Sequence, residues 1–128
     1  MASQFGILTV TQLNNLVNFD LTITDESSNR IYSDDFIEAQ ISQAEYLVFG
    51  YVKQEYTSST IPNDVLYVVR EMAKRYMINQ LIRDGLLNEP ILDEQEYFKE
   101  QFKTLLGPEY MEGLYVSAEL IDDYEYDS

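Results

Sequence analysis

The chain has 128 residues, of which 45% are hydrophobic and 17 are aromatic, a composition that argues against a disordered chain and suits one domain with a modest core. Its 23 acids and 8 bases give a net charge of −15, which disfavours nonspecific nucleic-acid binding because phosphate contacts need clustered Lys and Arg. Cysteine and histidine are both absent, which excludes disulfides, thiolate metal sites and histidine-based catalysis.

The N-terminal stretch MASQFGILTV predicts neither a signal peptide nor a membrane span. It has no basic flank and too short an apolar run, and no apolar run of the chain reaches the roughly 20 residues that a span needs. We therefore expect no membrane association and a location in a cytoplasm, or in a particle assembled there.

Residues 1–8 are predicted to form an arm, and residues 9–19 a first helix that begins with the capping box of Thr9 and Gln12. Residues 20–32 are polar and rich in turn formers, which indicates a loop. Ser33 is predicted to cap a second helix that ends near residue 56, and Gly50 inside it costs about 1 kcal/mol relative to alanine. The apolar stripe of this helix consists of Ile37, Ile41, Ala44, Val48, Tyr51 and Val52.

Residues 61–85 form the predicted helix around which the rest of the chain is arranged. Pro62 suits its first turn, Asn63 or Thr60 is the expected cap, and Gly85 is the expected stop. One apolar side carries Val65, Val69, Met72 and Tyr76, whereas Ile78, Leu81 and Ile82 lie roughly opposite, at about 100° per residue. Both apolar sides of this helix must be buried. A fourth helix or another subunit can cover the second side.

Asp93 and Glu96 form a second capping-box pattern, which predicts a fourth helix that ends near residue 106, before Gly107 and Pro108. Residues 104–128 then contain seven acids and no base. The piece GLYVSAELI is a possible strand, and DDYEYDS an acidic tail. The predicted fold is all-α: a small four-helix domain with an N-terminal arm over residues 1–107, followed by an extended acidic C-terminal arm at residues 108–128.

Carboxylates are the remaining candidates for catalytic or metal chemistry. Asp34, Asp35 and Glu38 gather at a helix start, where a favourable interaction with the helix dipole explains them better than a glycosidase pair. Asp123, Glu125 and Asp127 alternate as in a calcium loop, but the glycine and the distal glutamate of such a loop are missing. We therefore predict no enzyme activity, no metal and no cofactor.

The central helix carries four of the eight bases, on it or at its end. Glu71 can pair with Arg75 at i, i+4. Arg70 and Lys74 are stacked like charges, which form either a solvated polar face or a contact with acids of a neighbouring subunit. The predicted subunit or portal interface consists of Arg70, Lys74, Arg75, Ile78, Leu81, Ile82, Leu114, Tyr115, Val116, Tyr124 and Tyr126.

The run FIEAQISQAEYLVFGYVKQEY, a short link and IPNDVLYVVREMAKRYMINQLI together resemble the head-to-tail connector proteins of tailed viruses, the adaptor or head-completion family. LTVTQLNNL resembles the first helix of that family and YFKEQFKTLLG the fourth, so the resemblance covers about residues 7–107. Gln40 replaces a usual small residue, and Glu55 stands where the family often has a base, so the contact of that base is not carried over. The matching residues are Ile37, Glu38, Ala39, Ala44, Gly50, Tyr51, Val52, Tyr56, Pro62, Ala73 and Leu81.

This resemblance implies a structural virion protein of a bacterial or archaeal tailed virus, assembled in the host cytoplasm. Copies would form a ring, usually of twelve, that docks beneath the portal at the head–tail neck. The ring would extend the DNA channel and present a platform for a head-closure or tail protein, and DNA would pass without specific binding. The acidic arm would contact the portal or embrace a neighbouring subunit.

An acidic inhibitor that mimics DNA and occupies a nucleic-acid-binding enzyme is the alternative. Its support is the net charge alone. A mimic needs acids spaced over a broad outer face, whereas seven acids here cluster in the last 25 residues. The layout of charge therefore favours the assembly protein.

Overall fold

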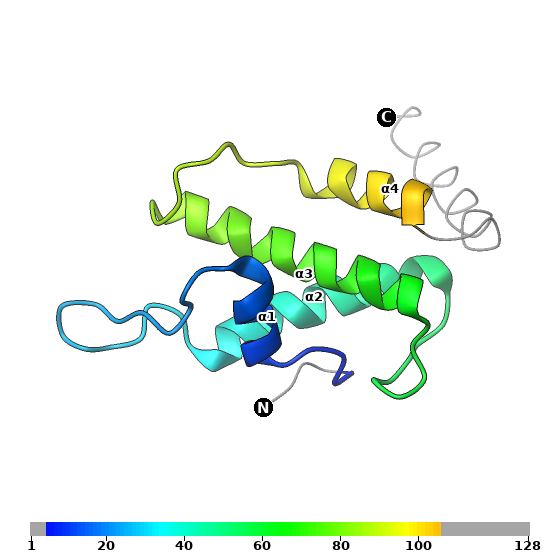
Figure 1. The fold of residues 1–128 in the computed structure, drawn as a ribbon, viewed down its shortest axis with the longest axis horizontal. Coiled ribbons are helices and arrows are strands. Elements are labelled where there is room, and N and C mark those ends of the chain that lie inside the picture. Colours follow the sequence, from blue (N-terminus) through cyan, green and yellow to red (C-terminus); the bar gives the residue numbers. More distant parts are fainter. Residues whose placement is uncertain (1–4, 106–128) are drawn as a thin grey trace, which may run out of the picture.

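The computed structural model describes residues 5–105, which form four helices (Figure 1): α1 (Val10–Val17), α2 (Asp34–Val52), α3 (Asn63–Arg83) and α4 (Glu94–Leu105). The loop between α1 and α2 holds an isolated β-bridge between Thr24 and Arg30. The predicted all-α class with four helices is confirmed. The predicted strand and acidic tail after residue 108 lie outside the described residues.

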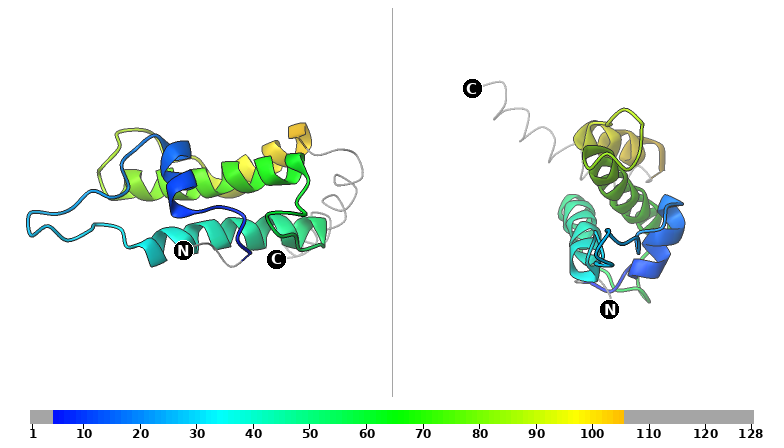
Figure 2. Two further views of the ribbon diagram at one scale, coloured as in Figure 1. Left: turned by 60° about the horizontal axis from the view of Figure 1, so that its bottom comes forward. Right: turned by 90° about the vertical axis from the view of Figure 1, so that its left-hand side faces the viewer.

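Helix α3 is the centre of the fold, as the sequence predicted. It packs against all three other helices, and α1 also packs against α2. The views in Figure 2 show α3 between α2 and α4, with α1 alongside. Ile78 and Leu81, on the second apolar side of α3, are buried in the core of the same chain. The cover of that side therefore comes from this chain.

Local capping signals place three helix starts correctly. The hydroxyl of Thr9 accepts from the backbone N–H of Gln12 while the Gln12 side chain accepts from the N–H of Thr9, which completes the predicted capping box. The Ser33 hydroxyl accepts from Phe36 N, and the Asp93 carboxylate accepts from Glu96 N at the start of α4. These bonds satisfy backbone donors that have no partner inside the helix.

The start of α3 differs from the prediction. Pro62 is the N-cap residue, and it has no side chain that could accept a hydrogen bond. Asn63 is already the first helical residue, and the Thr60 hydroxyl instead accepts from Thr57 N, at 2.9 Å, inside the preceding turn. Neither expected cap is therefore used.

The ends of α1 and α2 also differ from the prediction, whereas the end of α3 agrees with it. Asn18 adopts a left-handed conformation (φ 57°) and stops α1 at Val17, before residue 19. Lys53 adopts a left-handed conformation (φ 57°) and stops α2 at Val52, before residue 56. Gly85 (φ 78°) follows α3 as predicted. Its N–H donates to Ile82 O, and the next N–H donates to Leu81 O, which is the Schellman pattern that satisfies the last carbonyls.

Two polar side chains, Glu45 and Asn79, are fully buried among the described residues, and each fixes a non-helical segment. Glu45, on α2, accepts from the backbone N–H groups of Phe5 (3.3 Å) and Ile7 (3.1 Å), so it holds the N-terminal arm on the body. Asn79, on α3, donates to Leu92 O (2.8 Å) and to Glu94 (3.1 Å), and it accepts from Leu92 N. The Asn79 amide thus positions the entry to α4.

Candidate functional site

The apolar residues of the predicted interface on α3 are largely inside the chain. Ile78 is 7% exposed and Leu81 is 0% exposed, so neither side chain is free to meet a neighbour while the chain is folded. Ile82 is half-buried and packs against the same core. The five predicted interface residues of the C-terminal arm lie outside the described residues: Leu114, Tyr115, Val116, Tyr124 and Tyr126.

Arg75 joins α3 to α4. Its guanidinium lies 5.2 Å from the centre of the Tyr97 ring, and its buried Nε has no hydrogen-bond partner among the described residues. The Tyr97 hydroxyl donates to Glu71 at 3.2 Å, and burial, followed by the charge of Glu71, raises the pKa of Tyr97. No Glu71–Arg75 ion pair forms between these two described side chains; the expected pair is replaced by an Arg–Tyr–Glu cluster between two helices.

Arg70 and Lys74 form what we call the basic ridge, on the outer side of α3. Arg70 is exposed, Lys74 is half-buried, and neither makes an ion pair within residues 5–105. Every other arginine of the chain has a partner there: Arg30 pairs with Asp34 at 2.9 Å, Arg83 with Glu94 at 3.7 Å, and Arg75 stacks on Tyr97. Among the described residues, Arg70 alone of the arginines contacts neither a carboxylate nor a ring.

Helices α2 and α3 carry opposite charge. Helix α2 contains four acids and no base, whereas α3 contains four bases and two acids. The described residues hold all eight bases and 16 of the 23 acids. The basic ridge is therefore a local positive surface on an acidic body.

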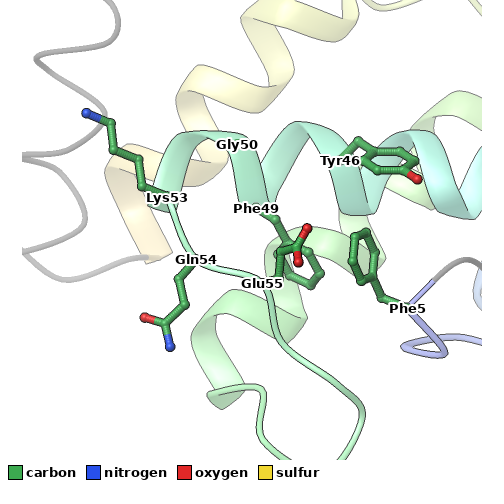
Figure 3. A pocket seen from close by; sticks show the side chains of 7 residues that line it. All are labelled: Phe5, Tyr46, Phe49, Gly50, Lys53, Gln54 and Glu55. Atoms are coloured by element: carbon green, nitrogen blue, oxygen red, sulfur yellow. The ribbon is translucent and has the colours of Figure 1, made fainter.

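A shallow hollow of about 280 Å³ lies where the N-terminal arm meets α2, and we call it the aromatic hollow (Figure 3). The Phe5 ring packs edge-on against Tyr46 (centroids 5.4 Å apart) and Phe49 (5.1 Å apart). Tyr46 is 56% exposed, more than the other exposed large apolar side chains in the described part. In Figure 3 the side chains of Lys53 and Gln54 extend away from these rings. The residues that line the hollow are Phe5, Tyr46, Phe49, Gly50, Lys53, Gln54 and Glu55.

Gly50 lines the aromatic hollow and explains part of its shape. A Cβ atom at this position would meet no heavy atom within 4 Å. No close helix crossing within the described chain therefore requires the glycine. Its place in the solvent-facing surface of α2 leaves open space beside Tyr46.

We expect the substitution Gly50→Ala to raise the free energy of unfolding of the single chain by up to about 1 kcal/mol, because alanine has the higher helix propensity and the site has room for its methyl group. Urea unfolding followed by circular dichroism measures this change. Ala39→Gly, at an exposed position of the same helix, is the matched control, and we expect it to lower stability by a similar amount. A loss of stability in Gly50→Ala would contradict this view of the site.

Tyr32 and Asp84 join the start of α2 to the end of α3. The Tyr32 hydroxyl donates to Asp84 Oδ2 at 2.5 Å, and the Gln80 amide donates to the same oxygen at 3.1 Å. These two bonds, with Tyr32 the larger cause, lower the pKa of Asp84. Burial, with the bond to Asp84, raises the pKa of Tyr32.

We expect Tyr32→Phe to lower the free energy of unfolding at neutral pH by about 1 kcal/mol, the usual net value of one hydrogen bond. A carboxyl with a lowered pKa stabilises the fold above its unfolded pKa of about 4, and this stabilisation is lost as the pH falls through the folded pKa. The difference between wild type and variant should therefore shrink below about pH 4. Urea unfolding at several pH values measures it, and a difference that stays constant into acid would contradict the assignment.

The acidic side chains of the described chain form no metal-binding cluster. Asp34, one of the three acids at the start of α2, is paired with Arg30. Residues 5–105 contain no group of three or more acidic side chains arranged to hold a metal ion. None of the helices in this part of the chain is long and apolar enough to cross a membrane.

Sequence reasoning missed the buried carboxylate of Glu45 and the aromatic hollow. A signal for Glu45 was present, since it lies four residues after Ile41 and three before Val48, beside the apolar stripe of α2. No comparable signal exists for the hollow, because Phe5 reaches Tyr46 only through the path of the arm. No family model matches this chain, and neither does any curated protein or solved structure with which it was compared.

Proposed function

We propose that this chain is a structural subunit of the neck of a tailed virus. Copies assemble into a ring beneath the portal, extend the DNA channel and connect the head to a head-closure or tail protein. The proposal is supported by the resemblance of residues 7–107 to connector proteins and by a four-helix body whose central helix carries an uncompensated basic ridge.

The basic ridge is the observation that carries the proposal. Arg70 and Lys74 are stacked like charges with no acid partner in the described chain, which a solitary helix disfavours. A chain with a net charge of −15 presents acidic surface to its own copies, so a positive ridge favours association between copies and sets their orientation. The net negative charge of the assembled ring would let DNA pass without sticking.

The test is complementation of a virus that lacks this protein. Arg70→Glu with Lys74→Glu should leave the helical content of the purified chain unchanged, because neither side chain contributes to the core. It should reduce incorporation into particles more than tenfold, which corresponds to about 1.4 kcal/mol of lost binding free energy. Cryo-electron microscopy of native particles should place the chain between portal and tail.

The matched control is Lys99→Glu with Lys103→Glu on α4, which reverses two exposed charges at the same i, i+4 spacing. These particles should resemble wild type. Equal loss for both pairs, or the chain lying elsewhere in the particle, would contradict the proposal. Strong inhibition of a nuclease or restriction enzyme by the pure protein would instead favour the DNA-mimic inhibitor.

The C-terminal arm has a separate role in the proposal. Its seven acids and its tyrosines suit a segment that contacts the portal or a neighbouring subunit. Deletion of residues 108–128 should weaken attachment to the portal. If attachment were unchanged, the C-terminal arm would have no role in binding the portal, and the proposed role of the basic ridge would be unaffected.

A further inference from the structure

The aromatic hollow has the chemistry that an arginine side chain prefers. The rings of Phe5 and Tyr46 offer π faces, and the exposed carboxylate of Glu55 belongs to the same lining. A guanidinium gains about 0.5–2 kcal/mol over an aromatic face and pairs well with a carboxylate. The chain already uses this combination where Arg75 lies over Tyr97 and Tyr97 bonds to Glu71.

The outer face of α2 beside the hollow has the composition of an interface. The exposed positions of this helix hold two charges, Asp34 and Asp35, both in its first turn. The exposed positions from Ala39 to Gly50, which lead to the hollow, hold none, in a chain where 24% of residues are charged. Depletion of charge and enrichment of tyrosine are typical of the buried centre of protein interfaces. The open space at Gly50 lets a partner approach the backbone closely. The exposed residues of this face are Asp35, Ala39, Gln43, Tyr46 and Gly50.

The hollow and the basic ridge point in different directions. Tyr46 lies about 160° around α2 from the buried Ala44, and Arg70 lies about 160° around α3 from the buried Met72, at 100° per residue. Helices α2 and α3 pack on each other and run side by side in opposite directions (Figure 2). Two complementary surfaces on different sides of a subunit generate a head-to-tail contact, which closes into a ring or continues as a filament.

We infer that the aromatic hollow of one copy receives the basic ridge of the next copy, with Arg70 between the Tyr46 ring and the Glu55 carboxylate. This inference rests on the proposed function, since it supplies the contact by which copies assemble. The occupant is a second copy because the ridge holds the one arginine of the described chain without a carboxylate or ring partner. The Glu55 carboxylate in the lining complements its charge, and the side chain of Lys53, the other charged lining residue, extends away from the rings (Figure 3).

The absence of cysteine permits a direct test on the full-length chain. Gln54→Cys labels the rim of the hollow, and Tyr67→Cys labels the exposed position one turn before Arg70. The two variants, mixed and treated with a short bismaleimide, should give heterodimers at least tenfold faster than either variant gives dimers alone. Ser27→Cys, in the exposed loop, replaces Gln54→Cys in the control mixture.

Charge exchange adds specificity to this test. Arg70→Glu in the Tyr67→Cys chain should reduce the heterodimer yield more than tenfold, and Glu55→Arg in the Gln54→Cys chain should restore it. Lys99→Glu should leave the yield unchanged. Gly50→Ala in the Gln54→Cys chain should reduce the heterodimer yield although it stabilises the single chain. The effect of this substitution on docking can therefore be told apart from its effect on folding.

Several results would overturn the inference. Yields equal to the Ser27→Cys control, or equally strong cross-linking of one variant to itself, would exclude a head-to-tail contact through these surfaces. Loss of the Arg70→Glu effect after deletion of residues 108–128 would assign the ridge to the acidic arm instead. If the chain lies in the neck but this cross-link fails, the proposed function stands and this contact falls. If the cross-link forms but no particle contains the chain, this contact stands and the proposed function falls.

Discussion

Replacement of Glu45 by alanine is expected to lower the free energy of unfolding by about 3 kcal/mol, because it removes a buried acceptor from two backbone N–H groups, each of which costs about 1–3 kcal/mol when left unsatisfied. Glu45 is 0% exposed and its two oxygens accept from Phe5 and Ile7. Urea unfolding monitored by circular dichroism measures the loss. Proteolysis within the arm should accelerate in parallel, because Glu45 holds residues 5–7 in place.

Two further variants define the cause. Glu45→Gln keeps one carbonyl acceptor and the same shape, so its loss should lie between those of wild type and alanine. Glu26→Ala removes an exposed acid from the loop before α2 and should change stability by less than about 0.5 kcal/mol. If Glu45→Ala were as mild as Glu26→Ala, the buried carboxylate would not hold the arm.

Replacement of Leu81 by alanine is expected to lower the free energy of unfolding of the single chain by about 3 kcal/mol, within the usual 2–5 kcal/mol for a buried leucine. Leu81 is 0% exposed in the core on α3. Sequence periodicity placed Leu81 at an interface, where its truncation would weaken assembly and leave the single chain intact. The core position predicts a loss that is independent of protein concentration.

The neighbouring Ile82 is the matched control, since it is only half-buried. Ile82→Ala should cost clearly less than Leu81→Ala, at about 1 kcal/mol, because less of its surface leaves water on folding. If Leu81→Ala lowered stability only at protein concentrations where copies associate, Leu81 would instead lie at an interface between copies. Equal costs at both positions would contradict the difference in burial.

The helices were predictable where a short-range signal decides the structure. Thr9 with Gln12, and Ser33 before two acids, cap α1 and α2 with side chains three residues or fewer from the groups they bond. Gly85 stops α3 because glycine adopts a positive φ at little cost. These features depend on local stereochemistry, so the local sequence predicts them.

Two of the boundary errors, at the end of α2 and the start of α3, arise where no such signal exists. Lys53 takes the left-handed conformation in place of glycine, and nothing in its residue type indicates this. Pro62 begins α3 without a side-chain cap, so its fixed φ, rather than a hydrogen bond, prepares the first turn. In both cases the chain path between α2 and α3 overrides the local preference.

The candidate surfaces were predicted in part. The stacked cations Arg70 and Lys74 were recognisable from their spacing, and the structure leaves them exposed or half-buried without a partner among the described residues. Periodicity showed that Ile78 and Leu81 lie opposite the first stripe, but it could not show that cover comes from the same chain. The pairing of Phe5 with Tyr46 joins positions 41 residues apart, which no local pattern encodes.

The Asn79 amide determines which length changes the α3–α4 connection can accept. Its three hydrogen bonds all reach residues 92–94, so they fix the offset of α4 along α3 at the start of α4. Leu86 and Leu87 still pack against the core, whereas residues 88–91 are exposed, so insertion or deletion at 88–91 only reshapes an exposed bend. One residue gained after Leu92 would instead slide α4 and its phenylalanines out of register, so evolutionary variation in length belongs before that anchor.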